Sequence, residues 1–333
     1  MKTLLLGCNG MLGQKMRQLL PKDGTVSVLD RPDIDFCRPE TVEAALEVHN
    51  PELVINCAAH TAVDRCESEE ALAMQINGMG PGLLATWAQR HEATLVHISS
   101  DYVFAGDRQN PYREEDATGP RSAYGRSKLA GEQAILTSGL KRFLIVRTSW
   151  LYGEGGPNFV ETMLRLASER EELRVVADQI GSPTLTDDLA QAILWLLESG
   201  HYGMYHFSNE GACSWHAFAT EIIAGAQARD ARLKVRRILP IATCEYPLPA
   251  PRPAYSLLSK EKYRMATRKA VPSWQDALAR YLDWRFGKRE GACPDETHRM
   301  YRIERAGKKR KEWLWRFTRA SFWRAAPEPG SIP

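Results

Sequence analysis

The chain has 333 residues, of which 44% are hydrophobic and 26% are charged, and its formal net charge is +3. These proportions are typical of a folded globular protein and exclude wholesale disorder. No apolar run approaches the roughly 20 residues that cross a bilayer, so we do not expect an integral membrane protein.

The first half of the sequence alternates short apolar runs with amphipathic stretches. Strands are predicted at Lys2–Leu6, Val26–Leu29, Leu53–Cys57, Thr94–Ile98 and Phe143–Arg147. Helices are predicted at Met11–Leu20, Glu40–His49, Glu69–Arg90 and Tyr124–Thr137, the third with an irregularity at Gly78–Gly82, where Gly80-Pro81 interrupts it. Apolar strands separated by helices favour an α/β fold with a parallel sheet buried on both faces, which is the Rossmann-like doubly wound architecture.

The regular alternation of predicted strands and helices ends after Trp150. Helices are predicted at Asn158–Glu169, Thr186–Glu198, Trp215–Ala226 and Trp274–Asp283, with short strands and a proline-rich segment between them. We therefore expect three parts. Residues 1–150 form a dinucleotide-binding domain that is rejoined by residues 186–207, most of residues 151–283 form a smaller substrate-binding α/β domain over the carboxyl ends of the strands, and residues 284–333 form a tail.

The seven cysteines are odd in number and widely spaced, and no two of them form a C-x-x-C pair. This distribution argues against a disulfide framework and against a zinc site. It favours reduced thiols in a cytoplasmic protein, and we predict no metal site.

A glycine-rich turn follows the first strand and opens the first helix. Gly7, Gly10 and Gly13 have the spacing G-x-x-G-x-x-G. Glycines permit a tight turn and let the backbone approach a pyrophosphate, while the helix N-terminus offers free N–H groups. The second strand ends at Asp30, where a carboxylate can accept hydrogen bonds from the adenosine ribose. Asp30 favours NADH, whereas Arg31 beside it suits the 2′-phosphate of NADPH, and the sequence leaves this choice open.

Tyr124 and Lys128 form a Y-x-x-x-K pair, and residues four apart share one face of a helix. A nearby ammonium stabilises a phenolate, so we expect Lys128 to move the pKa of Tyr124 toward neutrality. Ser100 follows the fourth strand, at the sheet edge where ligands of doubly wound folds bind, and is preferred over Ser99. Its hydroxyl can bind the same carbonyl oxygen as the tyrosine, so the three residues predict a carbonyl reductase.

With these features the sequence resembles the extended short-chain dehydrogenase/reductases, and among them the group that modifies nucleotide sugars. The resemblance covers about residues 1–285 and rests on six blocks in this order: Asn56–Asp64, Ser100–Phe104, Tyr124–Glu132, Arg147–Tyr152, Asp178–Thr184 and Arg252–Ser256.

The resemblance implies roles for individual residues. It implies that the cofactor is held by the glycine turn with Met11 and Leu12, by Asp30, by Asp35 and Phe36 near the adenine, and by the loop of Ala58, Ala59, His60 and Thr61. Tyr124 would donate the proton, Lys128 would hold the nicotinamide ribose, and Ser100 would polarise the carbonyl. Asp101, Trp150 and Arg252 would bind the substrate, the last at its diphosphate, although Trp150 also suits a core position.

The implied reaction is NAD(P)H-dependent reduction of the 4-keto group of dTDP-4-dehydro-6-deoxy-L-mannose to dTDP-L-rhamnose, for cell-surface polysaccharides. Two alternatives stay open. One is a cofactor-binding regulatory subunit similar to the β-subunit of methionine adenosyltransferase. The other is a reductase or epimerase of a different nucleotide-4-keto sugar.

Two further expectations concern partners. The resemblance implies that some members of this group dimerise through a magnesium ion held by glutamates, one of them in the first helix. Lys15 stands at the matching position and cannot bind the metal, so the sequence leaves open both a homodimer and the involvement of magnesium. Beyond Trp284 the resemblance ends, and 13 basic residues stand against 6 acidic ones. Basic and aromatic residues at 308–324 suit a membrane surface or a protein partner, and no nucleic acid is expected.

Overall fold

The computed structural model describes residues 1–287, so the predicted tail of residues 284–333 lies outside the described residues from 288 onward, its basic and aromatic segment at 308–324 included. Its main sheet has six strands in the order β10-β5-β4-β3-β1-β2, and every pairing in it is parallel. The strands are β1 (Thr3–Leu6), β2 (Val26–Leu29), β3 (Leu53–Asn56), β4 (Thr94–Ser100), β5 (Phe143–Thr148) and β10 (Gly203–His206). This confirms the predicted doubly wound α/β fold.

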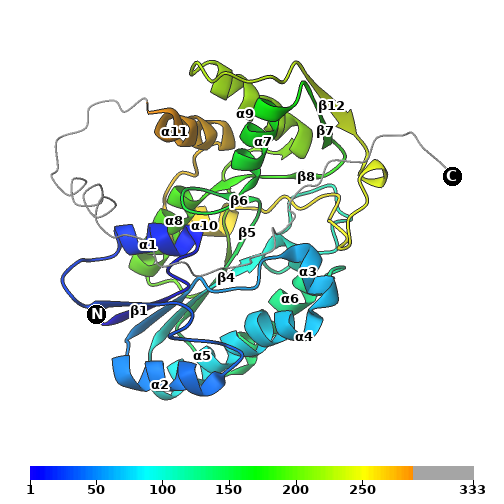
Figure 1. Cartoon of the computed structure of the whole chain (residues 1–333). Coiled ribbons are helices and arrows are strands. Elements are labelled where there is room, and N and C mark those ends of the chain that lie inside the picture. The colour runs from blue at the N-terminus through cyan, green and yellow to red at the C-terminus, as the bar shows by residue number, and fades with distance from the viewer. Residues whose placement is uncertain (288–333) are drawn as a thin grey trace, which may run out of the picture.

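Helices cover both faces of the main sheet (Figure 1). The helices α1 (Met11–Leu19) and α8 (Thr186–Ser199) pack on one face, and α2 (Pro39–His49), α5 (Gly80–Arg90) and α6 (Ala123–Thr137) pack on the other. Alternate residues of a strand point to opposite faces, so Leu5 joins the first core while Leu4 and Leu6 join the second. The short helix α10 (Glu261–Thr267) lies against α8 and β10.

The helical region before β4 is irregular one turn earlier than predicted. It consists of α3 (Val63–Ser68), α4 (Glu70–Ala73), a π-helical turn η1 (Met74–Met79) and then α5. Pro81 follows this turn within one continuous helical stretch, and it lacks the N–H that would bond the Asn77 carbonyl four residues earlier. The turn packs against α6, where a Cβ added to Gly131 would lie 2.2 Å from the same Asn77 carbonyl oxygen.

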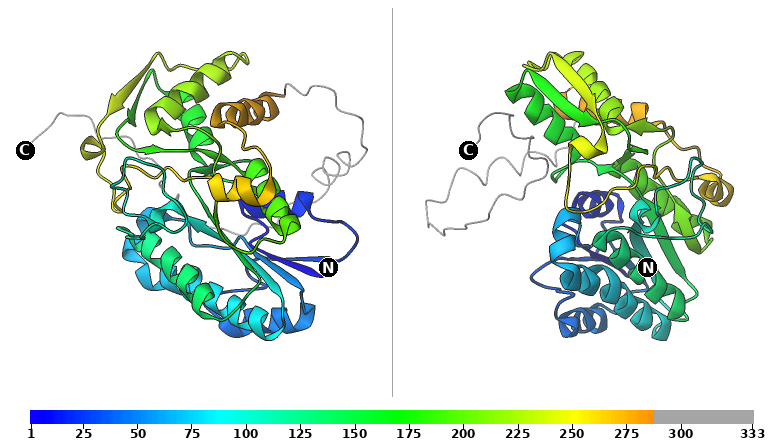
Figure 2. Two further views of the ribbon diagram at one scale, coloured as in Figure 1. Left: turned by 180° about the vertical axis from the view of Figure 1, so that it is seen from behind. Right: turned by 90° about the vertical axis from the view of Figure 1, so that its right-hand side faces the viewer.

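A second region stands over the carboxyl ends of the main strands and is green to orange in Figure 2. Its core lies between three helices, α7 (Phe159–Glu169), α9 (Trp215–Gln227) and α11 (Trp274–Phe286), and the parallel pair β7 (Glu172–Val176) and β12 (Arg237–Ile241). Four two-residue strands form two further pairs: β6 (Leu151–Tyr152) with β9 (Thr184–Leu185), and β8 (Ile180–Gly181) with β11 (Cys213–Ser214). One-turn 3-10 helices lie at η2 (Asp101–Val103) and η3 (Thr243–Glu245).

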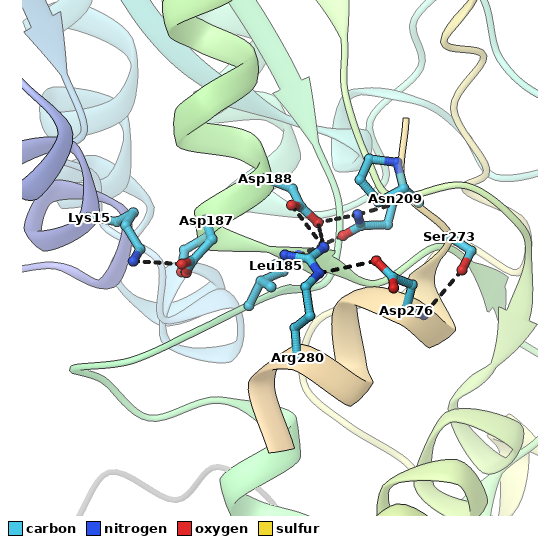
Figure 3. A network of polar contacts seen from close by, with 10 residues as sticks. Lys15, Leu185, Asp187, Asp188, Asn209, Ser273, Asp276 and Arg280 are labelled. Carbon is cyan, nitrogen blue, oxygen red and sulfur yellow. Dashed lines mark hydrogen bonds and ion pairs between the residues drawn. The ribbon is translucent and has the colours of Figure 1, made fainter. Parts of the chain in front are cut away.

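Polar contacts join α11 of the second region to α8 on the main sheet (Figure 3). Arg280 of α11 binds both carboxylate oxygens of Asp188 at 2.7 and 2.9 Å, and Asn209 donates to the same carboxylate at 2.6 Å. On the neighbouring turn, Lys15 of α1 forms an ion pair with Asp187 at 2.6 Å. None of the helices within residues 1–287 has the length and apolar character needed to cross a membrane.

Candidate active site

A cavity of about 580 Å³ lies between the carboxyl edge of the main sheet and the second region. The glycine turn after β1, the loop after β3, the end of β4 and the face of α6 line one side of it. The loops at 148–159 and 243–252 line the other. A cavity at this edge is where doubly wound folds bind their ligands.

The glycine turn is built so that backbone groups lie in close contact. Gly7 has φ +74°, and a Cβ there would lie 2.5 Å from the backbone nitrogen of Ala58. A Cβ on Gly13 would lie 2.0 Å from the Gly7 oxygen, so neither position accepts a larger residue. Gly10, Met11, Leu12 and Gly13 line the cavity, and no acidic residue occupies the first turn of α1. The free N–H groups and positive helix end therefore suit an anion.

The four predicted adenosine contacts lie outside the cavity wall. The carboxylate of Asp30 accepts hydrogen bonds from the backbone nitrogens of Asn9 and Arg31, both at 2.8 Å, so it braces the glycine turn. Asp35 accepts from the backbone nitrogen of Cys37 at 2.9 Å. Phe36 is buried in the core beneath Gly80 of α5.

The loop after β3 contributes two of its four predicted residues to the cavity, Ala59 and Thr61. Ala58 packs against the glycine turn instead. The side chain of His60 binds Glu69 at 3.1 Å. The backbone N–H of His60 donates to Asn77 Oδ1 at 2.8 Å, and the backbone oxygen of His60 accepts from Asn77 Nδ2 at 3.0 Å. His60 therefore anchors the loop.

Ser100, Tyr124 and Lys128 line the same cavity, as the sequence predicts. Ser100 Oγ donates to Asp101 Oδ1 at 2.9 Å and accepts from the backbone nitrogen of Tyr102 at 3.2 Å. Lys128 Nζ donates to the carbonyl oxygen of Ile98 at 2.6 Å. These contacts fix the serine and the lysine to the end of β4.

Burial controls the ionisation of these groups. It raises the pKa of Tyr124 well above its usual range, against a smaller opposite effect of the hydrogen bond with Ser100. The pKa of Tyr124 is thus raised rather than moved toward neutrality, which differs from the expectation drawn from the Y-x-x-x-K spacing. Burial lowers the pKa of Lys128 to about 8. Tyr124 is therefore a protonated phenol at neutral pH, which is the form that a proton donor requires.

The predicted substrate residues lie at the seam with the second region. Burial raises the pKa of Asp101 to about 6, against hydrogen bonds from Ser256 and Ser100 that lower it. Trp150 has φ +48°, and its ring stacks on that of Trp215 with centroids 3.6 Å apart and planes 11° apart. A Cβ on Gly181 would lie 2.7 Å from the Trp150 ring, so this position also requires glycine.

Arg252 lines the cavity, but its guanidinium is occupied. It binds both carboxylate oxygens of Asp64, at 2.5 and 2.8 Å, and the carbonyl oxygen of Ala250 at 2.6 Å. Burial acts to raise the pKa of Asp64, and the hydrogen bonds from Arg252 and the Ala250 nitrogen outweigh it and lower that pKa. The pair joins the first turn of α3 to the loop after η3.

Sequence reasoning missed much of the cavity wall, including three polar or aromatic residues: Asp64, Gln179 and Trp215. Asp64 and Gln179 stand inside motifs that the analysis quoted, yet nothing in the sequence pairs Asp64 with a residue 188 positions away. Trp215 opens a helix after Ser214, and an aromatic residue there is equally typical of a core.

Comparison with known proteins supports one family. The model of the family described as "RmlD substrate binding domain" matches residues 1–285. A protein of Burkholderia thailandensis named dTDP-4-dehydrorhamnose reductase is 43% identical over 84% of this chain and 97% of its own length. The spore coat polysaccharide biosynthesis protein SpsK of Bacillus subtilis is 44% identical over 88% and 99%, respectively.

Solved structures agree. The crystal structure of dTDP-4-dehydrorhamnose reductase from Bacillus anthracis in complex with NADP is similar, with a TM-score of 0.79 and 41% identity. It covers 84% of this chain and 98% of that one. These matches confirm the resemblance to nucleotide-sugar reductases. The chain belongs to the RmlD substrate-binding-domain family.

Proposed function

We propose that this chain is a reductase that converts dTDP-4-dehydro-6-deoxy-L-mannose to dTDP-L-rhamnose with NADPH or NADH. The observation that carries the proposal is that Ser100, Tyr124 and Lys128 line one cavity together with the glycine turn. Relatives that bear this enzyme's name align over nearly their whole length. The spore coat relative supports a role in cell-surface polysaccharide synthesis.

The glycine turn fits the pyrophosphate of a dinucleotide, because it brings the N-terminus of α1 to the cavity wall and no acidic residue occupies the first turn of that helix. In this proposal Gly10, Met11 and Leu12 hold the pyrophosphate, and Ala59 and Thr61 lie beside the nicotinamide end. Asp30 and Arg31 bind the adenosine ribose, which requires Asp30 to keep an acceptor site free beside its bonds to the turn. The bound dinucleotide supplies the hydride.

The side chains of the cavity then act on the substrate oxygen. Tyr124 donates its phenolic proton to the oxygen as the carbonyl is reduced. Ser100 has one hydroxyl hydrogen and donates it to Asp101, so in this proposal the serine turns from Asp101 to the substrate oxygen. Asp101 and Trp150 contact the sugar. Arg252 reaches the diphosphate by leaving Asp64.

In this proposal different parts of the chain bind the cofactor and the substrate. Residues 1–150 with 186–207 bind the cofactor, since β10 joins the main sheet and α8 covers its face. Residues 151–283 bind the substrate. The six cysteines of residues 1–287 are free thiols, which supports a cytoplasmic location. A homodimer remains a prediction from the resemblance, to be checked by light scattering.

The test is oxidation of NADPH and NADH at 340 nm by the purified chain, with enzymatically generated dTDP-4-dehydrorhamnose as substrate and identification of the product. Turnover to dTDP-L-rhamnose is expected. UDP- and GDP-linked 4-keto sugars serve as controls for the nucleotide. Cofactor binding without turnover of any of them would overturn the proposal in favour of a regulatory subunit, and preference for another nucleotide would replace the substrate.

A further inference from the structure

A row of three buried polar side chains runs behind the cavity, from β3 across β4 to α6. Asn56, His97 and Lys128 are 1–2% exposed. Asn56 Nδ2 lies 3.2 Å from His97 Nδ1, and His97 Nε2 lies 3.4 Å from Lys128 Nζ. The proposed function uses only the last of the three residues, although buried polar groups in such a row act on one another strongly.

The orientation of the row is fixed at its far end. The backbone nitrogen of Ala58 donates to Asn56 Oδ1 at 3.1 Å, which assigns the two ends of the amide. The amide nitrogen of Asn56 therefore faces His97 and donates to Nδ1, so Nδ1 carries no proton. Burial, and next the charge of Lys128, hold the pKa of His97 well below its usual range. A neutral His97 with a bare Nδ1 carries its one proton on Nε2.

The Nε2–H group of His97 thus points at Lys128 Nζ. An ammonium has only hydrogens to offer and cannot accept this hydrogen bond, whereas a neutral amine can. We propose that Asn56 and His97 are positioning residues that direct the Nε2–H at Lys128 and so disfavour the ammonium form of its side chain.

The other titratable groups around Lys128 have also to be considered, because a nearby carboxylate would favour the ammonium form. On its own helix, Glu132 is the one carboxylate that favours the ammonium, and both of its oxygens are bound by Arg147 of β5 at 2.7 and 2.8 Å. Asp101, Tyr124 and the Cys57 thiol line the same cavity as Lys128. The turn η1, which packs against α6, contains no titratable residue.

Only the catalytic consequence of this inference rests on the proposed function. A lysine with both forms accessible near neutral pH can return a proton to the Tyr124 phenolate and become an amine, which then takes a proton from solvent water. The protonation states themselves are measurable without substrate. Failure of the proposed activity and failure of this inference are therefore distinguishable.

The first experiment uses the unaltered full chain with ¹⁵N-labelled histidine. Two-bond ¹⁵N–¹H spectra distinguish the two neutral tautomers and the imidazolium, and the loss of one signal in His97→Phe assigns the residue. We expect neutral His97 with its proton on Nε2 throughout pH 6–9. A proton on Nδ1, or an imidazolium below pH 7, would overturn the proposal.

The second experiment reverses the tautomer of His97. In Asn56→Asp the carboxylate accepts both from Ala58 and from His97, which moves the His97 proton to Nδ1 and leaves a bare Nε2 for Lys128. The ¹³Cε shift of Lys128, assigned with Lys128→Arg, should then titrate at a pKa at least one unit higher, a tenfold change in the ammonium-to-amine ratio at a given pH.

The double variant Asn56→Asp/His97→Phe is the matched control for the added charge. If the effect passes through His97, the shift in the Lys128 pKa disappears on the His97→Phe background. A shift that persists there is a through-space charge effect and contradicts the proposal, as does an unchanged pKa in Asn56→Asp. Circular dichroism checks folding, and if Asn56→Asp does not fold, the tautomer of the unaltered chain decides alone.

Discussion

The two walls of the cavity are held in different ways. On the sheet side, the reactive side chains lie on regular elements and are fixed by buried backbone or ionic contacts. An example is the bond from Lys128 to the Ile98 oxygen at the end of β4. On the opposite side, short strands and loops form the wall together with the first turns of α7 and α9. Side chains distant in sequence hold this wall, such as the stacked rings of Trp150 and Trp215.

This difference separates chemistry from recognition. A proton donor must be held within a few tenths of an ångström, and strands packed between helices supply that rigidity. A wall made of loops tolerates rearrangement around a bulky nucleotide sugar. We therefore expect changes on the sheet side to reduce kcat or the stability of the fold, and changes on the loop side to raise KM.

The largest effect is expected for Tyr124→Phe, which removes the proton donor from the sheet side. The variant should lose a factor of about 10²–10⁴ in kcat and keep its affinity for NADPH. Stopped-flow turnover and fluorescence titration of the cofactor measure the two quantities.

Tyr102→Phe is the matched control, because Tyr102 lines the same cavity and its ring meets that of Tyr124 edge to face at 5.4 Å. It removes a hydroxyl without removing the proposed donor, so its kcat should fall far less. Equal losses in the two variants would contradict the role of Tyr124.

The next effect concerns the stability of the sheet side. Glu132 and Arg147 form an ion pair whose side chains are 1% and 3% exposed, and Ser99 donates to the same carboxylate. Glu132→Gln leaves the Arg147 charge buried with a neutral partner, which should cost about 3–5 kcal/mol of unfolding free energy. Urea unfolding followed by circular dichroism measures it.

The exposed pair of Arg126 and Glu70 provides the comparison, with side chains 42% and 50% exposed. Glu70→Gln should cost no more than about 1 kcal/mol, because water screens this pair. If both substitutions had the same small cost, the sheet side would not be held by its buried pair.

The contrast between the two walls also explains what the sequence predicts. The glycine turn, Ser100, Tyr124 and Lys128 are local patterns on elements whose periodicity is plain, and the parallel sheet then brings their ends to one edge. At Gly7 and Gly13 the close backbone contacts permit no other residue, which agrees with the tight turn that the glycine spacing predicts.

The other wall has no such local signal. The ion pair between Asp64 of α3 and Arg252 depends on a loop after η3 whose course no periodicity determines. The buried position of Phe36 depends on the approach of α5, which tertiary packing sets. Burial likewise raises the pKa of Tyr124, although the Y-x-x-x-K spacing predicts the opposite. Such effects depend on the three-dimensional surroundings rather than on sequence spacing.

The effect of burial on the pKa of Asp101 can be tested through the pH dependence of stability. Its folded pKa is about 6, above the value near 3.9 in an unfolded chain, so the folded state binds the extra proton between these values. The contribution of Asp101 to stability is therefore greatest at low pH and falls as pH rises from about 4 to 6. By linkage the loss is about 2–3 kcal/mol.

Asp101→Asn removes this titration and keeps an acceptor for the Ser100 hydroxyl. Relative to the unaltered chain, the variant should become more stable by about 2–3 kcal/mol between pH 4 and pH 7.5, as measured by urea unfolding at both values. Parallel pH profiles for the two proteins would show that burial does not raise the pKa of this carboxyl.

The smallest effect is expected on the loop side, at Arg252. If the guanidinium leaves Asp64 to bind the substrate diphosphate, Arg252→Met should raise KM for the dTDP sugar about tenfold, equivalent to about 1.4 kcal/mol, with little change in kcat. Asp64→Asn should leave KM unchanged or lower it, because it frees the fork of Arg252. If the ion pair of Asp64 and Arg252 instead only joins α3 to the loop after η3, both substitutions should raise KM to the same extent. The two variants thus decide whether Arg252 recognises the substrate or only supports the wall around it.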